Sequence, residues 1–119
     1  MSNVWQNNLI LEKADFFAHQ IYSISKSFPK SEIYGLTSQI RRVSVSVVLN
    51  MIEGYSRFKH KSHIHFLEIS FGSLKETHYL IDFRLQEGIL SKKSASLLLE
   101  LCNEIEKMLY SKIKTLKSK

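Results

Sequence analysis

The stretch that decides the fold is residues 33–57, which read IYGLTSQIRRVSVSVVLNMIEGYSR. Apolar residues recur in it at three- and four-residue spacing, which is typical of one face of an amphipathic helix. This stripe consists of Ile33, Leu36, Ile40, Val43 and Val47. Asn50 and Gly54 take its next two positions, although a buried Asn needs hydrogen-bond partners and a helical Gly lowers stability unless a close contact requires it. The pattern therefore predicts a long helix that packs closely against its neighbours.

A second apolar stripe lies about 100° around the same predicted helix. It consists of Val45, Val48, Ile52 and Tyr55. One partner surface inside a small bundle does not need both stripes, so the second predicts an interface between copies of the chain. The C-terminal helix has a similar surplus, which consists of Leu97, Leu99, Leu101 and Met108. Because these side chains would form an unusually large apolar patch on a monomer, we expect a homo-oligomer.

Helical spacing of apolar residues extends over most of the chain. It predicts helices over about residues 9–28, 30–54, 62–87 and 91–116. Pro29 separates the first two, since the residue before a proline avoids the helical region. Ser62 and Ser91 suit helix N-caps, and Gly88 suits a left-handed helix end. With few Gly and Pro residues, the chain predicts an all-α, antiparallel up-down-up-down four-helix bundle, a single domain over residues 1–119.

The chain is basic, with a formal net charge of +6 and a pI of about 9.5. Residues 54–67 and 107–119 contain no carboxylate and hold much of the excess. Positive surface of this kind suits phosphate backbones or acidic proteins. It also fits ordinary solubility and the favourable placement of cations near a helix C-terminus. Charge alone therefore leaves nucleic-acid binding open.

Several features indicate a cytoplasmic protein without a membrane partner. No apolar run approaches the ~20 residues that cross a bilayer. The N-terminus, MSNVWQNNLI, lacks the charged region and apolar core of a signal peptide. Cys102 is the one cysteine, so no internal disulfide can form, which fits a reducing compartment.

No residue pattern points to an enzyme, a cofactor or a metal. Bundles often hold di-iron sites built from Glu-x-x-His pairs, but no Glu in this chain has a His three residues later. We interpret His60, His63 and His65 as exposed residues of a basic link rather than metal ligands, because no Cys or carboxylate lies near them in the sequence. We interpret His78 as a core histidine bonded to a neighbouring helix. Gly-rich phosphate loops and the GxSxG motif are absent.

Polar residues on the second and third predicted helices indicate a structural network that fixes how these helices pack. Its predicted members are Asn50, Glu53, Ser73 and Glu76. Gly72 would permit close helix approach, and Glu76 would receive an arginine from the second helix. Glu53 and Arg57 are spaced for an i,i+4 ion pair. The alternative is a carboxylate pair for general acid-base catalysis, but no nucleophile or phosphate-binding loop accompanies it.

One ordered set of residues carries a resemblance to a known family. The set comprises Phe28-Pro29, Glu32, residues 34–42, Ser46, Asn50, Glu53-Gly54, Arg57, Phe66-Leu67, Gly72-Ser73-Leu74 and Glu76. Over most of its length the chain resembles the bacterial four-helix-bundle proteins encoded by intervening sequences in 23S rRNA genes, often called S23 ribosomal proteins. That family usually has a proline and small residues before the Asn, where this chain has Val47-Val48-Leu49.

The resemblance implies a four-helix bundle that assembles as a ring-like homopentamer. The family is also similar to the accessory variability protein of diversity-generating retroelements, a basic pentameric barrel that binds nucleic acid and partners a reverse transcriptase. Carried over to this chain, the matched basic positions are Arg41, Arg42 and Arg57. Lys59 and Lys61 extend that patch.

Three functional hypotheses follow from these observations. The first is a non-enzymatic oligomeric protein that binds RNA or DNA through its basic surface, by contacts to phosphates rather than to bases. The second is a protein-protein scaffold, for example an accessory subunit of a reverse transcriptase. The third, an enzyme, has the least support in the sequence.

Overall fold

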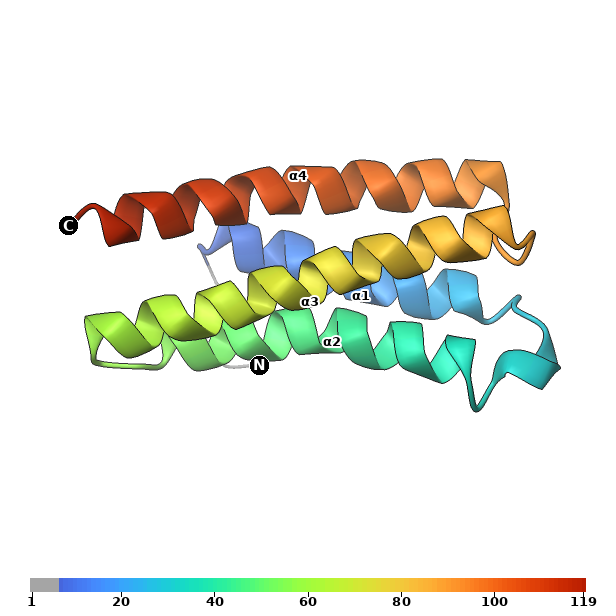
Figure 1. Ribbon diagram of the computed structural model, residues 1–119, viewed down its shortest axis with the longest axis horizontal. Helices are drawn as coiled ribbons and strands as arrows, with labels where there is room; N and C mark the ends of the chain where they lie inside the picture. Colours follow the sequence, from blue (N-terminus) through green and yellow to red (C-terminus); the bar gives the residue numbers. More distant parts are fainter. Residues whose placement is uncertain (1–6) are drawn as a thin grey trace.

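The computed structural model describes residues 7–119, which form four α-helices and no strand. The helices are α1 (Leu9–Ser25), α2 (Leu36–Tyr55), α3 (His60–Gln86) and α4 (Lys92–Lys117), with a 3-10 turn, η1 (Lys30–Glu32), between α1 and α2. The helices lie side by side in a rod of 45 × 28 × 22 Å (Figure 1). No helix in the described residues combines the length and the hydropathy that a bilayer crossing requires.

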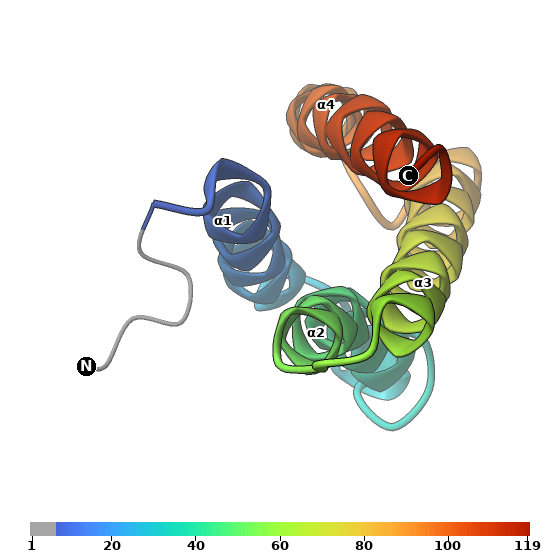
Figure 2. The same cartoon turned by 90° about the vertical axis from the view of Figure 1, so that its left-hand side faces the viewer.

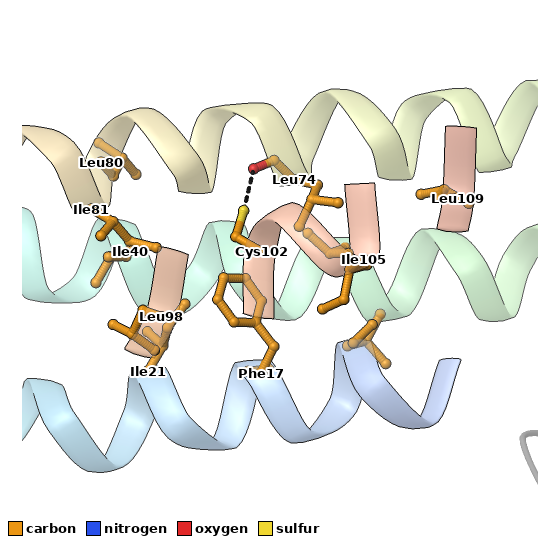
Figure 3. Close-up of a cluster of buried hydrophobic side chains, with 14 of the residues drawn as sticks. Phe17, Ile21, Ile40, Leu74, Leu80, Ile81, Leu98, Cys102, Ile105 and Leu109 are labelled. Atoms are coloured by element: carbon orange, nitrogen blue, oxygen red, sulfur yellow. Dashed lines mark hydrogen bonds between the residues drawn. The ribbon is translucent and has the colours of Figure 1, made fainter. Parts of the chain in front are cut away.

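The four helices surround one hydrophobic core. Helices α1 and α3 each contact both α2 and α4, and the view along the bundle shows all four around a common interior (Figure 2). Phe17, Met51, Leu74 and Ile105, one from each helix, are fully buried. The close-up shows core side chains such as Phe17, Leu74 and Ile105 pointing into the space between the helices (Figure 3). The predicted all-α class with four helices is confirmed.

The junction between α1 and α2 differs from the prediction. Helix α1 ends at Ser25 rather than at residue 28, and the Ser25 hydroxyl donates to the Tyr22 carbonyl at 3.0 Å. Such local side-chain bonds compete with the helical ladder. Helix α2 begins at Leu36 rather than at residue 30, because Pro29 starts η1 and Gly35 has φ −116° and ψ −104°, outside the helical range.

The predicted helix caps at Gly88 and Ser91 are confirmed, whereas the predicted cap at Ser62 is wrong. Helix α3 begins at His60 with Lys59 as its N-cap residue, so Ser62 lies inside the first turn and does not cap the helix. Gly88 has φ 75°, the left-handed conformation predicted for it. Ser91 caps α4, because its hydroxyl accepts a hydrogen bond at 3.1 Å from the backbone N–H three residues later.

The two glycines expected at close helix contacts have different surroundings. Gly54 is buried, and a Cβ there would lie 3.1 Å from the His63 carbonyl oxygen and 3.2 Å from Leu67 Cδ2 of α3. A Cβ at Gly72 would meet no atom within 4 Å. Close approach of α2 and α3 therefore requires Gly54, whereas the prediction for Gly72 is wrong.

Only part of the predicted polar network forms between α2 and α3. Asn50 Nδ2 donates to the Ser46 carbonyl at 2.9 Å and to Ser46 Oγ at 3.0 Å, and that hydroxyl lies 3.2 Å from Ser73 Oγ. Glu53 instead forms the predicted ion pair with the arginine four residues later. Glu76 is exposed and has no ion-pair partner among residues 7–119. Neither carboxylate joins the network, and Glu76 receives no arginine from α2.

Arg84 is a buried charged residue that the spacing of apolar residues does not predict. Its side chain is fully buried on α3, where Nη1 donates to the Leu80 carbonyl at 2.9 Å and Nη2 donates to the Leu36 carbonyl at the start of α2. Burial lowers the pKa of Arg84, and the charge of nearby Glu32 opposes that change. Arg84 therefore links the end of α3 to the beginning of α2.

His78 bonds to a neighbouring helix, as predicted for a core histidine. Its Nδ1 lies 2.7 Å from Oε2 of Glu106 on α4, and Lys75 donates to the other oxygen of that carboxylate at 3.0 Å. Burial works to raise the pKa of Glu106, but hydrogen bonds from His78, Lys75 and Cys102 outweigh it and lower that pKa. These contacts tie α3 to α4.

Candidate nucleic-acid interface

The α2–α3 link and the last turns of α4 lie at the same end of the bundle (Figure 1, left). His60 Nε2 lies 2.9 Å from the Leu116 carbonyl oxygen, and Lys117 Nζ lies 2.5 Å from Glu68 Oε2. We call residues 53–68 together with residues 112–119 the basic end. Both basic segments are visible in the sequence, but their meeting in space is not among the predictions. The order of four helices joined by short links is the signal that could have predicted it.

Most cations of the basic end have no ion-pair partner. The region contains the basic residues Arg57, Lys59, Lys61, Lys112, Lys114, Lys117 and Lys119. Its two carboxylates, Glu53 and Glu68, are taken up by Arg57 and Lys117. The other five lysines are exposed and form no ion pair within the part of the chain that the structure describes. Because unpaired cations are free to meet external anions, this end is the strongest candidate for a polyanion interface.

Phe58 is a fully exposed aromatic residue at the tip of the α2–α3 link. It lies between Arg57 and Lys59 and lines a groove of about 620 Å³ together with Glu53 and Ser62. Phe58 is not among the predicted site residues, although the sequence shows it between basic residues of a link, as RFKHK. Aromatic rings among cations are the usual stacking platforms for single-stranded nucleic acids.

Two further grooves continue from the basic end along α3 and α4. One, of about 390 Å³, lies between the start of α3 and the C-terminus and is lined by His65, Lys61 and Lys119. The other, of about 310 Å³, is lined by Phe71, Tyr110, Ile113 and lysines of the α4 C-terminus. Both contain Glu68 and Lys117, which form an ion pair. Exposed aromatic and basic groups thus extend from the link toward the middle of the molecule.

The five basic residues predicted to bind nucleic acid do not form one patch. Arg57, Lys59 and Lys61 belong to the basic end, whereas Arg41 and Arg42 lie about 24 Å away along α2, from a rise of about 1.5 Å per residue. Arg41 is also occupied: its Nε donates to Ser25 Oγ at 2.7 Å, and its guanidinium lies 4.2 Å from the centroid of the Tyr22 ring. Arg41 therefore ties α1 to α2, and exposed Arg42 is separate from the basic end.

The stripe predicted as an oligomer interface is largely buried within one chain. Val48 is 8% exposed, and Ile52 and Tyr55 pack against the core. Val45 remains 45% exposed beside a groove of about 430 Å³ between α1 and α2. The neighbouring Leu49 is 59% exposed. The stripe is covered because α1 packs on this side of α2, so Val48 is a core residue. Among the described residues of α2, the exposed large apolar side chains are Val45 and Leu49.

The predicted surplus on α4 is smaller than expected. Leu97 is exposed, whereas Leu99, Leu101 and Met108 are half-buried. The apolar flank of α2 therefore offers the stronger case for contact between copies.

The three histidines near the link are not all exposed. His63 lies within α3, its Nδ1 is 2.6 Å from the Gly54 carbonyl oxygen, and its ring lies edge-on to Tyr55 with centroids 5.3 Å apart. His60 bonds to α4, as described above, and His65 remains exposed. The prediction of exposed link residues is thus wrong for His63, which helps to hold α3 against α2.

Comparisons with known proteins agree with this architecture. The family model described as 23S rRNA-intervening sequence protein matches residues 6–111. The fold is also similar to a crystal structure of a protein with unknown function from the S23 ribosomal protein family from Bacteroides thetaiotaomicron VPI-5482. That similarity has a TM-score of 0.84 and 23% sequence identity, and it covers 90% of this chain and 96% of that one. No curated protein matches the chain. The chain belongs to the 23S rRNA-intervening sequence protein family.

Proposed function

We propose that the chain is a non-enzymatic, cytoplasmic, oligomeric protein that binds RNA or DNA through its basic end. The observation that supports this most directly is the meeting of lysines from two distant segments around exposed Phe58. In this proposal Lys59, Lys61 and the lysines of the α4 C-terminus contact phosphates, and Phe58 stacks on an unpaired base.

The chemistry of the basic end favours single strands and little sequence selectivity. Lysines that neutralise phosphates release condensed counterions, so affinity falls with salt by a slope of about 0.7 per contact for a single strand. Every base can stack on an aromatic ring, so stacking adds little sequence preference. Because lysine ammonium groups and one ring do not read base edges in a fixed pattern, the binding is expected to be largely independent of sequence.

The experiment that tests the proposal compares charge reversal at the two ends of the bundle. Fluorescence anisotropy measures the binding of labelled single-stranded RNA and DNA to the unmodified protein, to the double variant Lys59→Glu/Lys61→Glu and to the matched control Lys92→Glu/Lys93→Glu. Lys92 and Lys93 are exposed at the start of α4, at the opposite end of the molecule (Figure 1, right). Both variants change the net charge equally, so a difference between them reports location.

We expect the variant of the basic end to lose about tenfold or more in affinity at low salt, with a salt slope shallower by about 1.4 for two lost contacts. The control should change both quantities much less. Equal losses of affinity in the two variants would mean that net charge alone causes the effect. If the unmodified protein did not bind at low salt, the proposal would be rejected.

We also propose that the bundle, with its helices in antiparallel up-down-up-down order, assembles into a ring-like homopentamer. The contact between His60 at the start of α3 and Leu116 near the end of α4 supports the antiparallel order. The exposed Val45 and Leu49 support assembly, and the number five rests on the family resemblance. A ring would place five basic ends on one particle and would strengthen binding to a long polyanion through multivalency.

The second candidate function is a protein-protein scaffold, such as an accessory subunit of a reverse transcriptase. The same apolar flank of α2 favours it, because such a surface suits a protein partner as well as a second copy. The absorbance ratio at 260 and 280 nm after nuclease treatment, measured with the native mass, separates the candidates. A stable complex with a second protein and without nucleic acid would favour the scaffold.

A further inference from the structure

A compact set of metal-ligand side chains lies between α3 and α4. His78 on α3 and Cys102 and Glu106 on α4 each offer one ligand atom, and these three atoms lie within 4.8 Å of one another. The closest approaches are 2.7 Å from His78 Nδ1 to Glu106 Oε2 and 3.2 Å from Cys102 Sγ to the same oxygen. The sequence alone does not predict this set, because its members come from two helices and do not follow the Glu-x-x-His pattern.

The site is buried on one side and open on the other. Cys102 is fully buried, and its thiol faces the Leu74 carbonyl of α3 (Figure 3). The side chains of Glu106 and His78 are 11% and 28% exposed. A metal ion could therefore enter from the His78 side, and a water molecule could occupy a fourth coordination position there.

The residues around the set hold its members in place for coordination. His78 Nε2 faces Asp82 Oδ2 at 3.6 Å, so a carboxylate stands behind the imidazole, as is usual for histidines that bind metals. Lys75 donates to Glu106 Oε1 at 3.0 Å and leaves Oε2 facing His78 and Cys102. The ammonium opposes a nearby metal ion electrostatically, but the Lys75 side chain is 56% exposed and can turn toward water.

A tetrahedral ion requires these ligand atoms to lie slightly farther apart than they do here. Zinc bonds of about 2.3 Å to sulfur and about 2.0 Å to nitrogen and oxygen place neighbouring ligand atoms roughly 3.3–3.6 Å apart. The observed contacts to Glu106 Oε2 are shorter, so small side-chain rotations would open the site to that size. Thiolate, imidazole and carboxylate together are ligands that Zn²⁺ accepts readily.

We propose that His78, Cys102 and Glu106 bind Zn²⁺, with water as the fourth ligand, and that the ion joins α3 to α4. Hydrated Zn²⁺ exchanges its other waters for one bond each to Cys102 sulfur, His78 nitrogen and Glu106 oxygen, and it keeps one water as the fourth ligand. The Cys102 thiol releases its proton to water. The proton on His78 Nδ1 leaves to water or, by tautomerisation, is replaced by one on Nε2 facing Asp82. No electron is transferred.

Hydrogen bonds join the three side chains in the observed geometry. The short contact between His78 Nδ1 and Glu106 Oε2 requires a proton between two electron pairs. Only the thiolate form of Cys102 binds a metal ion, so the thiol proton leaves when the ion binds. Metal binding must therefore release at least one proton, which is itself measurable.

Cobalt supplies a spectroscopic test on the full-length protein. The chain is stripped with a chelator and titrated with Co²⁺ alone. We expect one ion per chain, visible absorption bands of tetrahedral intensity and a thiolate-to-cobalt charge-transfer band in the near ultraviolet. Added Zn²⁺ should displace the cobalt, and calorimetry in buffers of different ionisation enthalpy should show proton release.

Variants assign the ligands. Cys102→Ser should abolish the charge-transfer band, and His78→Gln and Glu106→Gln should each weaken Co²⁺ binding about tenfold or more. Asp82→Asn should weaken binding by roughly tenfold while the charge-transfer band stays in place, as expected for a residue that orients a ligand. The matched control, His60→Gln/His65→Gln, removes two histidines outside the site and should bind cobalt normally.

Two results would overturn the inference. One is the absence of saturable Co²⁺ binding by the unmodified protein. The other is binding that is unchanged by Glu106→Gln and His78→Gln, which would indicate a thiol or a surface histidine acting alone. Circular dichroism checks that each variant is folded. If Cys102→Ser does not fold, the binding of Co²⁺ by Glu106→Gln decides the question, because glutamine has nearly the same size as the glutamate that it replaces.

Discussion

At the scale of single residues, Arg84 is the charged side chain whose burial most needs an explanation. It has no exposed surface, its Nε has no hydrogen-bond partner within residues 7–119, and its two terminal nitrogens donate to the Leu80 and Leu36 carbonyls. Removing a guanidinium from water is costly unless its donors are satisfied. The long aliphatic stem packs between helices as well. The stability contributed by Arg84 should therefore come mostly from filled space.

This reasoning predicts different outcomes for two substitutions of Arg84. Arg84→Ala leaves a cavity and should lower the free energy of unfolding by about 3 kcal/mol. Arg84→Met fills most of the space without a buried charge and should lower it by about 1 kcal/mol. Urea unfolding, followed by circular dichroism at one protein concentration, measures both. A methionine variant as unstable as the alanine variant would mean that the hydrogen bonds to the two carbonyls dominate.

Alanine substitutions of Gly54 and Gly72 are expected to change stability in opposite directions. Gly54→Ala would place a methyl group 3.1 Å from a backbone oxygen of α3, which cannot move alone. We expect a loss of about 1–2 kcal/mol in unfolding free energy, although alanine favours the helix by about 1 kcal/mol. Gly72→Ala meets open space on exposed α3 and should raise stability by up to about 1 kcal/mol. Thermal unfolding of both variants checks the two signs, and a stabilised Gly54→Ala would contradict the tight α2–α3 contact.

At the scale of helices and links, the sequence predicts the existence of elements better than their ends. Spacing of apolar residues identifies four helices because it reports which face is buried. The ends depend on local backbone choices: Gly35 leaves the helical region, and Pro29 starts a short turn that delays α2. The spacing of apolar residues does not determine the backbone dihedral angles at Gly35 and Pro29. Predicted boundaries were thus displaced where turns intervened, while the caps at Gly88 and Ser91 followed from residue type.

The candidate interface was predictable only where it was local in sequence. Arg57, Lys59 and Lys61 are neighbours along the chain and stay together in space. The contacts of Arg41 are not predictable from the sequence, because its partners, Ser25 and Tyr22, belong to another helix. The exposure of Phe58 depends on how the link turns between α2 and α3, which the chain pattern does not specify.

The α2–α3 link gives a prediction that separates binding from folding. Phe58→Ala removes a ring with no packing role, so unfolding free energy should stay within about 0.5 kcal/mol. Loss of one stacked base should weaken binding to single-stranded RNA about tenfold, since stacking contributes roughly 1–3 kcal/mol per base. The matched control is Tyr34→Ala, because Tyr34 is 96% exposed beside η1 at the other end of the bundle (Figure 1). Equal losses in affinity for the two variants would remove Phe58 from the interface.

At the scale of the whole molecule, the question is which apolar surface one chain leaves uncovered. The second stripe of α2 was predicted to face another copy, but α1 already covers most of it. Val48 is 8% exposed, whereas Val45 and Leu49 are 45% and 59% exposed and lie one turn apart on α2. Two exposed side chains beside an apolar groove can bury more area than Leu97, the one exposed leucine of α4. Contact between copies should therefore use the α1–α2 flank.

Substitutions of exposed and of buried apolar residues on α2 should separate effects on assembly from effects on folding. Val45→Asp/Leu49→Asp places charges on the exposed flank and should lower the native mass while the helical circular dichroism signal stays, because an unpaired charge in a subunit contact is costly. Val48→Asp places the same charge inside the core and should unfold the chain. Leu97→Asp, an exposed leucine on α4, should leave the native mass unchanged. Light scattering coupled to size-exclusion chromatography measures these masses, and a 13.9 kDa particle for the unmodified protein would contradict the assembly. Loss of the assembly in Leu97→Asp alone would move the contact to α4, because only a buried position at an interface responds to an added charge in this way.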